Sequence, residues 1–192
     1  MSRLFLIRHA QPEALWGGDN NDPGLTKSGK AEAEATAQRM GAHGVMKVFT
    51  SPLKRARETA APIAQTYRSQ PIVEPRIGEV AAPPGTRDRR KWLDETFPWG
   101  DQATMRKWGS VEPALQQWRQ SVLQAATSLT EDAVFVTHYI AINVLVGAAM
   151  KSDFTVVCRP EFASITEMIV EDGQLIMLFR GEPIVASNAR PT

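Results

Sequence analysis

Two apolar stretches of the chain each end in a histidine. The first is LFLIRH at residues 4–9, where Arg8 and His9 follow four apolar side chains, and the second is AVFVTH at residues 133–138, which ends in His138. Both stretches have the composition of β-strands. In an open α/β sheet, ligands bind in the crevice beyond the carboxyl ends of the strands. We therefore expect His9 and His138 to lie close together at one end of a sheet.

A third cationic residue, Arg55, lies one turn inside the helix expected after another short strand. The guanidinium groups of Arg8 and Arg55 can each bind phosphate oxygens through paired hydrogen bonds. A structural alternative exists, in which Arg8 extends to solvent and each histidine caps a helix or makes a hydrogen bond in the core. That alternative is the commoner one for a lone histidine. It weakens when two histidines and two arginines gather at one end of a sheet, and the cluster then predicts an anion site that suits phosphate.

The elements that would position these residues alternate along the chain. We expect strands at residues 3–8, 45–50 and 133–138 and helices at residues 27–44, 51–67, 111–129 and 139–150. Residues 164–181 contain two strand-like segments around an Asp-Gly pair, which predicts a hairpin. The sequence thus predicts an α/β fold with a mostly parallel central sheet, helices on both faces, and a C-terminal β-hairpin at the sheet edge.

The length of the chain suits one domain over residues 1–192. Within it, residues 76–109 contain several prolines, three tryptophans and the charged run TRDRRK. We expect this segment to be a lid-like insertion. Aromatic residues bury large areas, so the tryptophans at positions 92, 99, 108 and 118 fit the core better than a substrate pocket, and the charged run fits a solvated face better than a second anion site.

The composition argues against several kinds of partner. The chain has 22 Lys and Arg against 21 Asp and Glu, so no overall positive field would attract nucleic acid or an acidic membrane. No apolar run approaches the ~18 residues of a membrane span. A single cysteine, Cys158, and the lack of a signal-like N-terminus favour a reducing compartment. We expect a cytoplasmic protein that binds neither nucleic acid nor membrane; its oligomeric state is unknown.

The motifs around these residues resemble the histidine phosphatase superfamily, also called the phosphoglycerate mutase-like family. They occur in family order over roughly the first three quarters of the chain, as LIRHA at 6–10, LTKSG at 25–29, SPLKRARETA at 51–60, IGE at 77–79 and VTH at 136–138. The resemblance implies a phosphoglycerate mutase-like fold and His9 as the nucleophile that becomes phosphorylated. It further implies that Arg8, Arg55 and His138 hold the phosphoryl group and that Glu79 protonates the leaving oxygen.

The chemistry of phosphoryl transfer fits those roles. Imidazole attacks only when neutral, so His9 needs a bare nitrogen, which a backbone carbonyl accepting the other ring N–H would fix. Two guanidinium groups and a protonated His138 can hold three equatorial oxygens without a metal ion. We therefore expect neither a metal nor a cofactor. The backbone N–H of Tyr139 can also reach a phosphate oxygen, and a carboxyl group at Glu79 with a raised pKa can act as the acid.

Several alternatives compete with these assignments. Glu74 rivals Glu79 as the acid, although Glu74 directly follows an apolar segment and fits the border of the sheet better. The segment GLTKSGKA at 24–31 imitates a phosphate-binding P-loop, but it lacks the Ser or Thr after the lysine and a strand before it. Arg57 lies on the opposite side of its helix from Arg55 and is expected to face solvent. His43 is expected to have a structural role near a helix C-terminus.

Departures from the family pattern bear on the reaction. Ala10 replaces the usual glycine after the nucleophile, which is harmless if its φ is negative. The G-x-W-E-G stretch of the mutases is absent, and the chain is shorter than typical mutases. The sequence therefore predicts a metal-independent phosphomonoesterase that acts on a small-molecule phosphate ester or a phosphoprotein. A phosphoglycerate-type mutase and a catalytically silent phospho-ligand binder or scaffold remain as alternatives.

Overall fold

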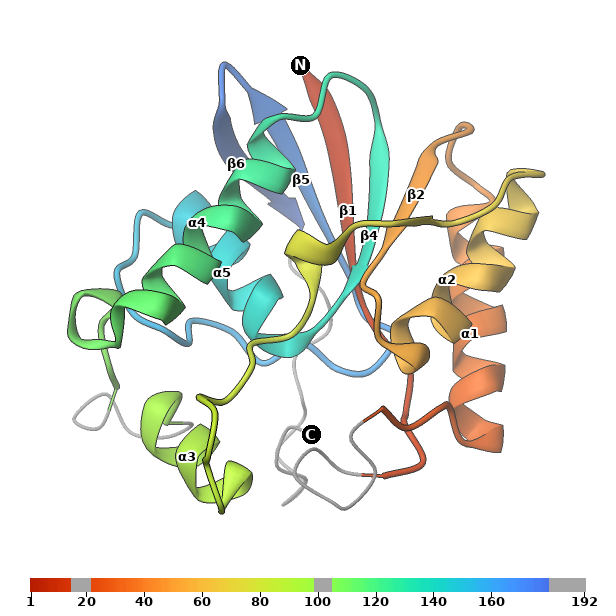
Figure 1. Ribbon diagram of the computed structural model, residues 1–192. Helices are drawn as coiled ribbons and strands as arrows, with labels where there is room; N and C mark the ends of the chain where they lie inside the picture. Colours follow the sequence, from red (N-terminus) through yellow and green to blue (C-terminus); the bar gives the residue numbers. More distant parts are fainter. Residues whose placement is uncertain (15–21, 99–104, 180–192) are drawn as a thin grey trace.

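A six-stranded sheet forms the centre of the computed structural model, which describes residues 1–14, 22–98 and 105–179 (Figure 1). The strand order is β3-β2-β4-β1-β5-β6. The four strands from β3 to β1 pair in parallel, whereas β5 pairs antiparallel with both β1 and β6. The bounds are Ser2–Arg8 for β1, Lys47–Thr50 for β2, Ile72–Val73 for β3, Ala133–Thr137 for β4, Ile165–Glu171 for β5 and Gln174–Phe179 for β6.

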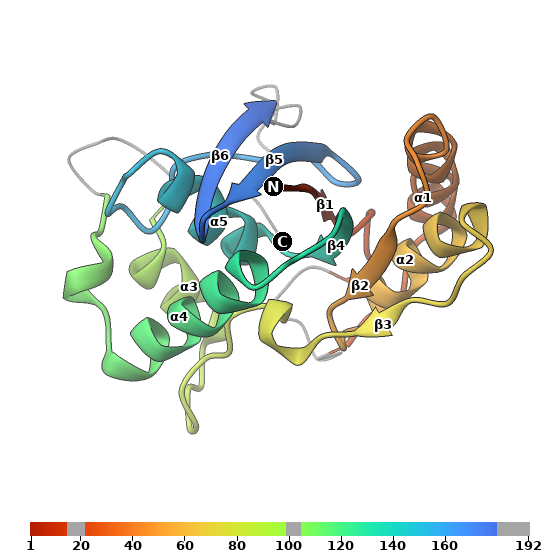
Figure 2. The same ribbon diagram turned by 90° about the horizontal axis from the view of Figure 1, so that it is seen from above.

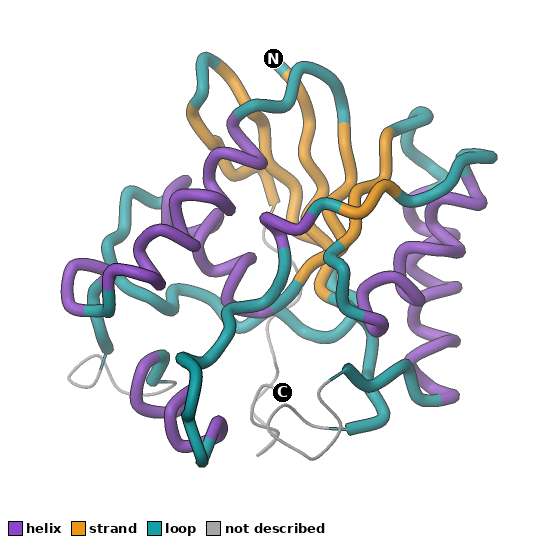
Figure 3. Tube along the Cα trace, viewed as in Figure 1, coloured by secondary structure: helices purple, strands orange, loops and turns teal. Residues whose placement is uncertain are grey.

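Helices cover both faces of this sheet (Figures 2 and 3). One face packs against α1 (Lys27–Met40) and α2 (Lys54–Thr66), and the other packs against α4 (Pro113–Thr127) and α5 (Tyr139–Ala149). Beyond the carboxyl ends of the parallel strands lies α3 (Arg89–Thr96). Two short 3₁₀ helices, η1 (Pro75–Ile77) and η3 (Trp108–Ser110), complete the described elements. The predicted mixed sheet with an antiparallel hairpin at its edge is confirmed.

The centre of β1, residues 4–7, is apolar at every position. Leu4 and Leu6 belong to the core that includes α4 and α5, whereas Phe5 and Ile7 belong to the core that includes α1 and α2. Successive side chains of a strand point to opposite faces. Because helices cover both faces, the central residues of β1 are apolar on both sides of the strand.

Local side-chain and turn chemistry accounts for the start of α1 and for the β5–β6 hairpin. Thr26 caps α1, accepting a hydrogen bond from the Gly29 N–H at 2.9 Å. Asp172 and Gly173 adopt positive φ values of 50° and 73° between β5 and β6, as a tight Asp-Gly hairpin turn requires. Residues 180 and 181 of the predicted hairpin lie outside the described residues.

The prediction for the start of α2 was wrong. The helix was expected over residues 51–67, where a Ser-Pro pair favours a helix start, but α2 begins at Lys54 and its N-cap, Leu53, makes no side-chain capping bond. The Ser51 hydroxyl is instead committed to His138 and to the Leu53 N–H. A tertiary contact therefore displaces the local capping preference.

The tryptophan-rich segment contributes to the core. Trp108 is buried and packs against Phe97 and Trp118, and Trp92 also packs against Phe97. This bears out the core interpretation for three of the four tryptophans; Trp99 lies outside the described residues. That residues 76–109 act as a lid stays a prediction.

Two peripheral residues occupy the positions expected from the sequence. His43 is half-buried against Phe5, with 4.6 Å between ring centroids, and Arg57 is exposed. In the described part of the chain, no helix combines the length and apolar character needed to cross a membrane.

We predict that Gly29→Ala destabilises the fold. A Cβ at this position would lie 2.2 Å from the backbone oxygen of Gln11, which also accepts the Thr26 N–H at 3.0 Å and therefore cannot move freely. Overpacking typically costs about 1–3 kcal/mol, which exceeds the gain of about 1 kcal/mol from placing alanine rather than glycine in a helix. Urea unfolding should detect the loss. The matched control is Gly44→Ala, where no atom lies within 4 Å of the added Cβ; equal unfolding free energies for both variants would contradict the prediction.

Candidate active site

The parallel pairing of β1 with β4 brings the two strand-terminal histidines together. Arg8 is level with Thr137 in the register, and the His9 N–H donates to the Thr137 carbonyl at 2.9 Å. The rings of His9 and His138 are then 5.1 Å apart between centroids, and both side chains are buried. The sequence prediction that these histidines meet at the carboxyl end of the sheet is therefore confirmed as geometry.

The tautomer of His9 follows from its two hydrogen bonds. Its Nδ1 lies 2.8 Å from the Ala10 carbonyl oxygen, which can only accept, so Nδ1 holds the ring proton. Its Nε2 accepts a hydrogen bond from Nε of Arg55 at 3.2 Å. Burial, then the charges of Arg55 and Arg8, hold the pKa of His9 well below its usual range. His9 is thus a neutral imidazole with its lone pair at Nε2.

The backbone after His9 does not require glycine. In the described residues, positive φ outside glycine occurs at four positions, Arg68, Lys151, Ala163 and Asp172, and Ala10 is not among them. The Ala10 N–H donates to Oγ1 of Thr59 at 3.0 Å. Alanine is therefore compatible with this turn.

Arg8 is held by a loop that is distant in the sequence. Its Nη1 donates to the Pro160 carbonyl at 2.9 Å, and its guanidinium lies 4.1 Å from the ring centroid of Phe162 and 5.1 Å from that of Tyr139. Burial lowers the pKa of Arg8 to about 10, so the group remains cationic at neutral pH. Burial also lowers the pKa of Arg55. Two desolvated cations therefore flank His9.

Glu79 joins this cluster from the segment after η1. Its Oε1 accepts the Val80 N–H at 2.9 Å and its Oε2 accepts the Ile140 N–H, in the first turn of α5, at 3.3 Å. A hydrogen bond of 2.6 Å from the Thr137 hydroxyl to the Ile77 carbonyl ties η1 to β4 just before this residue. Burial raises the pKa of Glu79, against the opposing effect of the two N–H donors and of the Arg55 and Arg8 charges.

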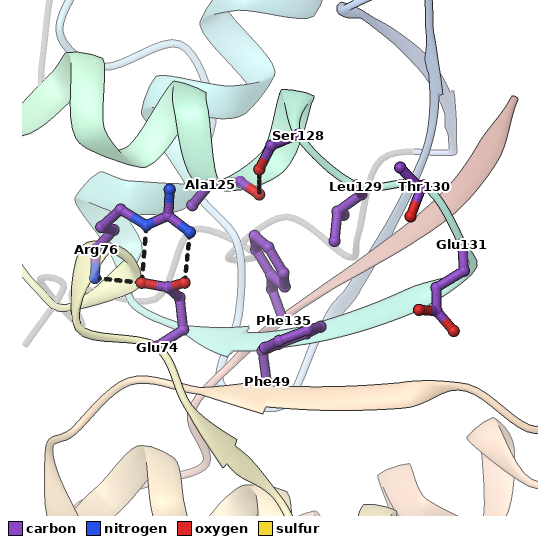
Figure 4. A pocket seen from close by; sticks show the side chains of 9 residues that line it. All are labelled: Phe49, Glu74, Arg76, Ala125, Ser128, Leu129, Thr130, Glu131 and Phe135. Atoms are coloured by element: carbon purple, nitrogen blue, oxygen red, sulfur yellow. Dashed lines mark hydrogen bonds and ion pairs between the residues drawn. The ribbon is translucent and has the colours of Figure 1, made fainter.

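Glu74, the rival acid, points toward Arg76 (Figure 4). Its carboxylate pairs with Arg76 at 2.6 Å, which lowers its pKa. Both residues line a pocket that contains none of the predicted site residues; its lining comprises Phe49, Glu74, Arg76, Ala125, Ser128, Leu129, Thr130, Glu131 and Phe135. Of the two carboxyl groups, Glu79 is the one whose pKa is affected by the charges of Arg55 and Arg8.

His138 departs from the sequence prediction in its charge. Its Nε2 lies 2.7 Å from the Ser51 hydroxyl oxygen. Burial, followed by the charges of Arg55, His9 and Arg8, holds its pKa well below the usual range, so the ring is neutral rather than protonated. The next residue, Tyr139, begins α5, where backbone N–H groups have no partner within the helix. Burial raises the pKa of its phenol, which stays neutral.

Sequence reasoning missed three residues that touch the cluster. Ser51 and Thr59 lie inside the SPLKRARETA motif. The sequence did not predict their hydrogen bonds to His138 and to the Ala10 N–H. Phe162 is 5.7 Å from His9 between ring centroids and stacks on Arg8. Nothing local marks this phenylalanine, because its position depends on the loop that precedes β5. Within the described ranges, no three His, Cys, Asp or Glu side chains gather as a metal site would require.

Comparison with known proteins agrees with this geometry. The family model for histidine phosphatase superfamily (branch 1) matches residues 4–180. The chain belongs to this superfamily. It is 28% identical over 167 residues to a probable phosphoglycerate mutase GpmB of Erwinia tasmaniensis, covering 78% of this chain and 75% of the relative. Over 111 residues it is 37% identical to a 2,3-bisphosphoglycerate-dependent phosphoglycerate mutase of Brucella ovis, covering 50% and 53% of the two chains.

Solved structures of the superfamily share the fold at low sequence identity. Bacillus stearothermophilus YhfR aligns with a TM-score of 0.73 at 20% identity, covering 95% of this chain and 98% of the other. A mycobacterial glucosyl-3-phosphoglycerate phosphatase aligns with a TM-score of 0.72 at 18% identity, covering 97% and 100%. A phosphoserine phosphatase of Entamoeba histolytica aligns with a TM-score of 0.69 at 19% identity, covering 96% and 98%.

The buried neutral histidines predict how stability depends on pH. Because the folded-state pKa values of His9 and His138 lie below the unfolded value near 6.5, the unfolded chain binds more protons as pH falls below about 6.5. Each histidine should therefore remove up to about 1.4 kcal/mol of unfolding free energy per pH unit in that window. Glu79 has a raised pKa and acts in the opposite direction.

Urea unfolding of the wild type and His138→Gln at several values between about pH 5 and pH 7 tests this expectation. The substitution should reduce the slope of unfolding free energy against pH, because one titrating group is gone. Identical slopes in the two proteins would show that His138 is not held neutral by the fold.

Proposed function

We propose that this protein is a metal-independent phosphomonoesterase that acts through a phosphohistidine at His9. The observation that supports this most directly is the neutral His9 ring, whose Nδ1 proton is fixed on the Ala10 carbonyl and whose Nε2 lone pair lies beside Arg55. A nucleophile of this kind divides one difficult displacement into two easier ones. Membership in the superfamily supports phosphoester chemistry in general.

In the first step, Nε2 of His9 attacks phosphorus, the P–N bond forms and the bond to the ester oxygen breaks. Glu79, whose pKa is raised by burial, gives its proton to that oxygen. In the second step, the Glu79 carboxylate takes a proton from water as the water oxygen attacks phosphorus and the P–N bond breaks. Inorganic phosphate, free His9 and protonated Glu79 result, so the cycle closes.

The positive groups around His9 would hold the transferring phosphoryl group. Arg8 and Arg55 supply buried guanidinium groups, and desolvation strengthens their electrostatic attraction for a phosphoryl group. His138 and the backbone N–H of Tyr139 complete the proposed set of donors. This arrangement needs no metal ion, because two arginines already balance the phosphoryl charge.

The substrate is a phosphate monoester, either a small molecule or a phosphoprotein. Phosphatases for glucosyl-3-phosphoglycerate and for phosphoserine share the fold, which supports the hydrolase assignment. A mutase is the second candidate, favoured by the similarity to GpmB. A silent phospho-ligand binder is less well supported, because binding alone needs neither a nucleophile like His9 nor an acid like Glu79. A cytoplasmic location remains part of the proposal.

Phosphate release by EDTA-treated protein across a panel of phosphomonoesters tests the proposal. The wild type should release phosphate and His9→Ala should not, while the variant still binds inorganic phosphate through Arg8 and Arg55. Turnover by His9→Ala would show that another group attacks. If the wild type releases none, dependence on a bisphosphorylated primer at constant total ester phosphate would identify a mutase.

We expect Glu79→Gln to separate esters by their leaving groups. Loss of the proton donor should slow alkyl esters by about 10²–10⁴-fold and aryl esters far less, because a phenolate leaves without protonation. Glu74→Gln is the matched control and should leave both rates near wild type, since its carboxylate faces Arg76. Equal losses on both ester classes in Glu79→Gln would argue against an acid role.

A further inference from the structure

His138 presents an unusual pair of ring nitrogens. Its side chain is fully buried, with Nε2 bound to Ser51 Oγ at 2.7 Å. Its Nδ1 is also buried and has no hydrogen-bond partner among the described residues. A buried polar atom without a partner costs free energy unless a ligand or water satisfies it. Nδ1 is therefore the nitrogen that remains for an anion bound beside His9.

The hydroxyl of Ser51 limits which tautomer His138 can adopt. Ser51 is fully buried, and within the described ranges Oγ has two hydrogen-bond partners, the Leu53 N–H at 3.2 Å and Nε2 of His138. The Leu53 N–H can only donate, so it occupies a lone pair of Oγ. The hydroxyl proton then has one acceptor within reach, the Nε2 lone pair. If Nε2 instead held the ring proton, the buried Ser51 O–H would lack an acceptor.

We propose that Ser51 is a positioning residue that fixes neutral His138 as the Nδ1–H tautomer, so that this ring donates a hydrogen bond to a bound phosphoryl oxygen without first gaining a proton. The inference deepens the proposed function, because it assumes an anion beside His9. It also explains how a ring held neutral can serve an anion site. A positively charged imidazole at His138 is not needed there.

The electrostatic surroundings favour a neutral donor over an imidazolium. Arg55 approaches from α2, Arg8 and His9 approach from the end of β1, and the carboxyl group of Glu79 lies at the first turn of α5. Arg55 and Arg8 both oppose a further positive charge on His138. A fixed N–H avoids that repulsion and still supplies a directed donor.

The test is ¹⁵N NMR of the histidine side chains, with sulfate as the probe because it is a tetrahedral dianion that does not titrate near neutral pH. In the wild type near pH 8, His138 should have a pyrrole-like Nδ1 and a pyridine-like Nε2, both free and with sulfate bound. An Nε2–H tautomer, or an imidazolium in the complex, would overturn the proposal. Neither measurement depends on turnover, so this outcome is independent of whether the protein is a phosphatase.

Variants provide the second arm. Ser51→Ala should allow the Nε2–H tautomer, turn the Nδ1 lone pair toward the anion, and weaken sulfate binding near pH 8 by roughly tenfold, as loss of a hydrogen bond to a charged group implies. The deficit should shrink at lower pH, where protonation restores a donor at Nδ1. Ser51→Thr keeps the hydroxyl and should restore the wild-type tautomer and pH profile.

Ser164→Ala is the matched control, because it removes another buried hydroxyl, one that has no hydrogen-bond partner in the described part of the chain. It should change neither the tautomer of His138 nor sulfate binding. A Ser51→Ala protein with the wild-type tautomer and a deficit constant with pH would assign Ser51 a merely structural role. That result would overturn the inference.

Discussion

Desolvation at the carboxyl ends of β1 and β4 is the constraint on which the rest of the site depends. Burial keeps both histidines neutral beside two arginines and raises the pKa of the Glu79 carboxyl group. It also strengthens the electrostatic interactions of the groups that remain charged. In water the same five side chains would titrate near their ordinary values. The chemical properties of the cluster therefore come from its enclosure as much as from its residue types.

That enclosure is built by contacts between distant parts of the chain. The loop before β5 supplies the Pro160 carbonyl and the Phe162 ring that hold Arg8. Asn143 of α5 anchors the same loop, since its side-chain oxygen accepts the Val157 and Cys158 N–H groups. The α5 helix thus contacts two parts of the site. Asn143, in the middle of the helix, holds the loop before β5, and Ile140, in its first turn, donates its N–H to Glu79.

Much of this arrangement was predictable from the sequence, for identifiable reasons. Strands that are apolar on both faces and end in polar residues predicted the sheet and the histidine pair. Parallel pairing of such strands brings the residues at their carboxyl ends to the same edge of the sheet. Glu79 was harder to separate from Glu74, since both flank the short η1. Their contacts distinguish them, because Glu74 pairs with Arg76 whereas Glu79 accepts backbone N–H groups of Val80 and Ile140. The neutral state of His138 and the partner of Ser51 depend on three-dimensional enclosure. No local pattern encodes either.

The position of β1 in the sheet has a consequence for synthesis of the chain. This strand is made before both of its neighbours, β4 and β5, which begin at residues 133 and 165. An emerging chain therefore holds an apolar strand with both edges unpaired while more than a hundred further residues are added, the situation in which nascent chains are most exposed to mispairing. His9 is therefore translated well before β4 and β5, and the residues that enclose it can assemble only after both strands have been made. Premature termination anywhere before β5 would leave His9 without the strand β5 and without the contacts that this strand supports.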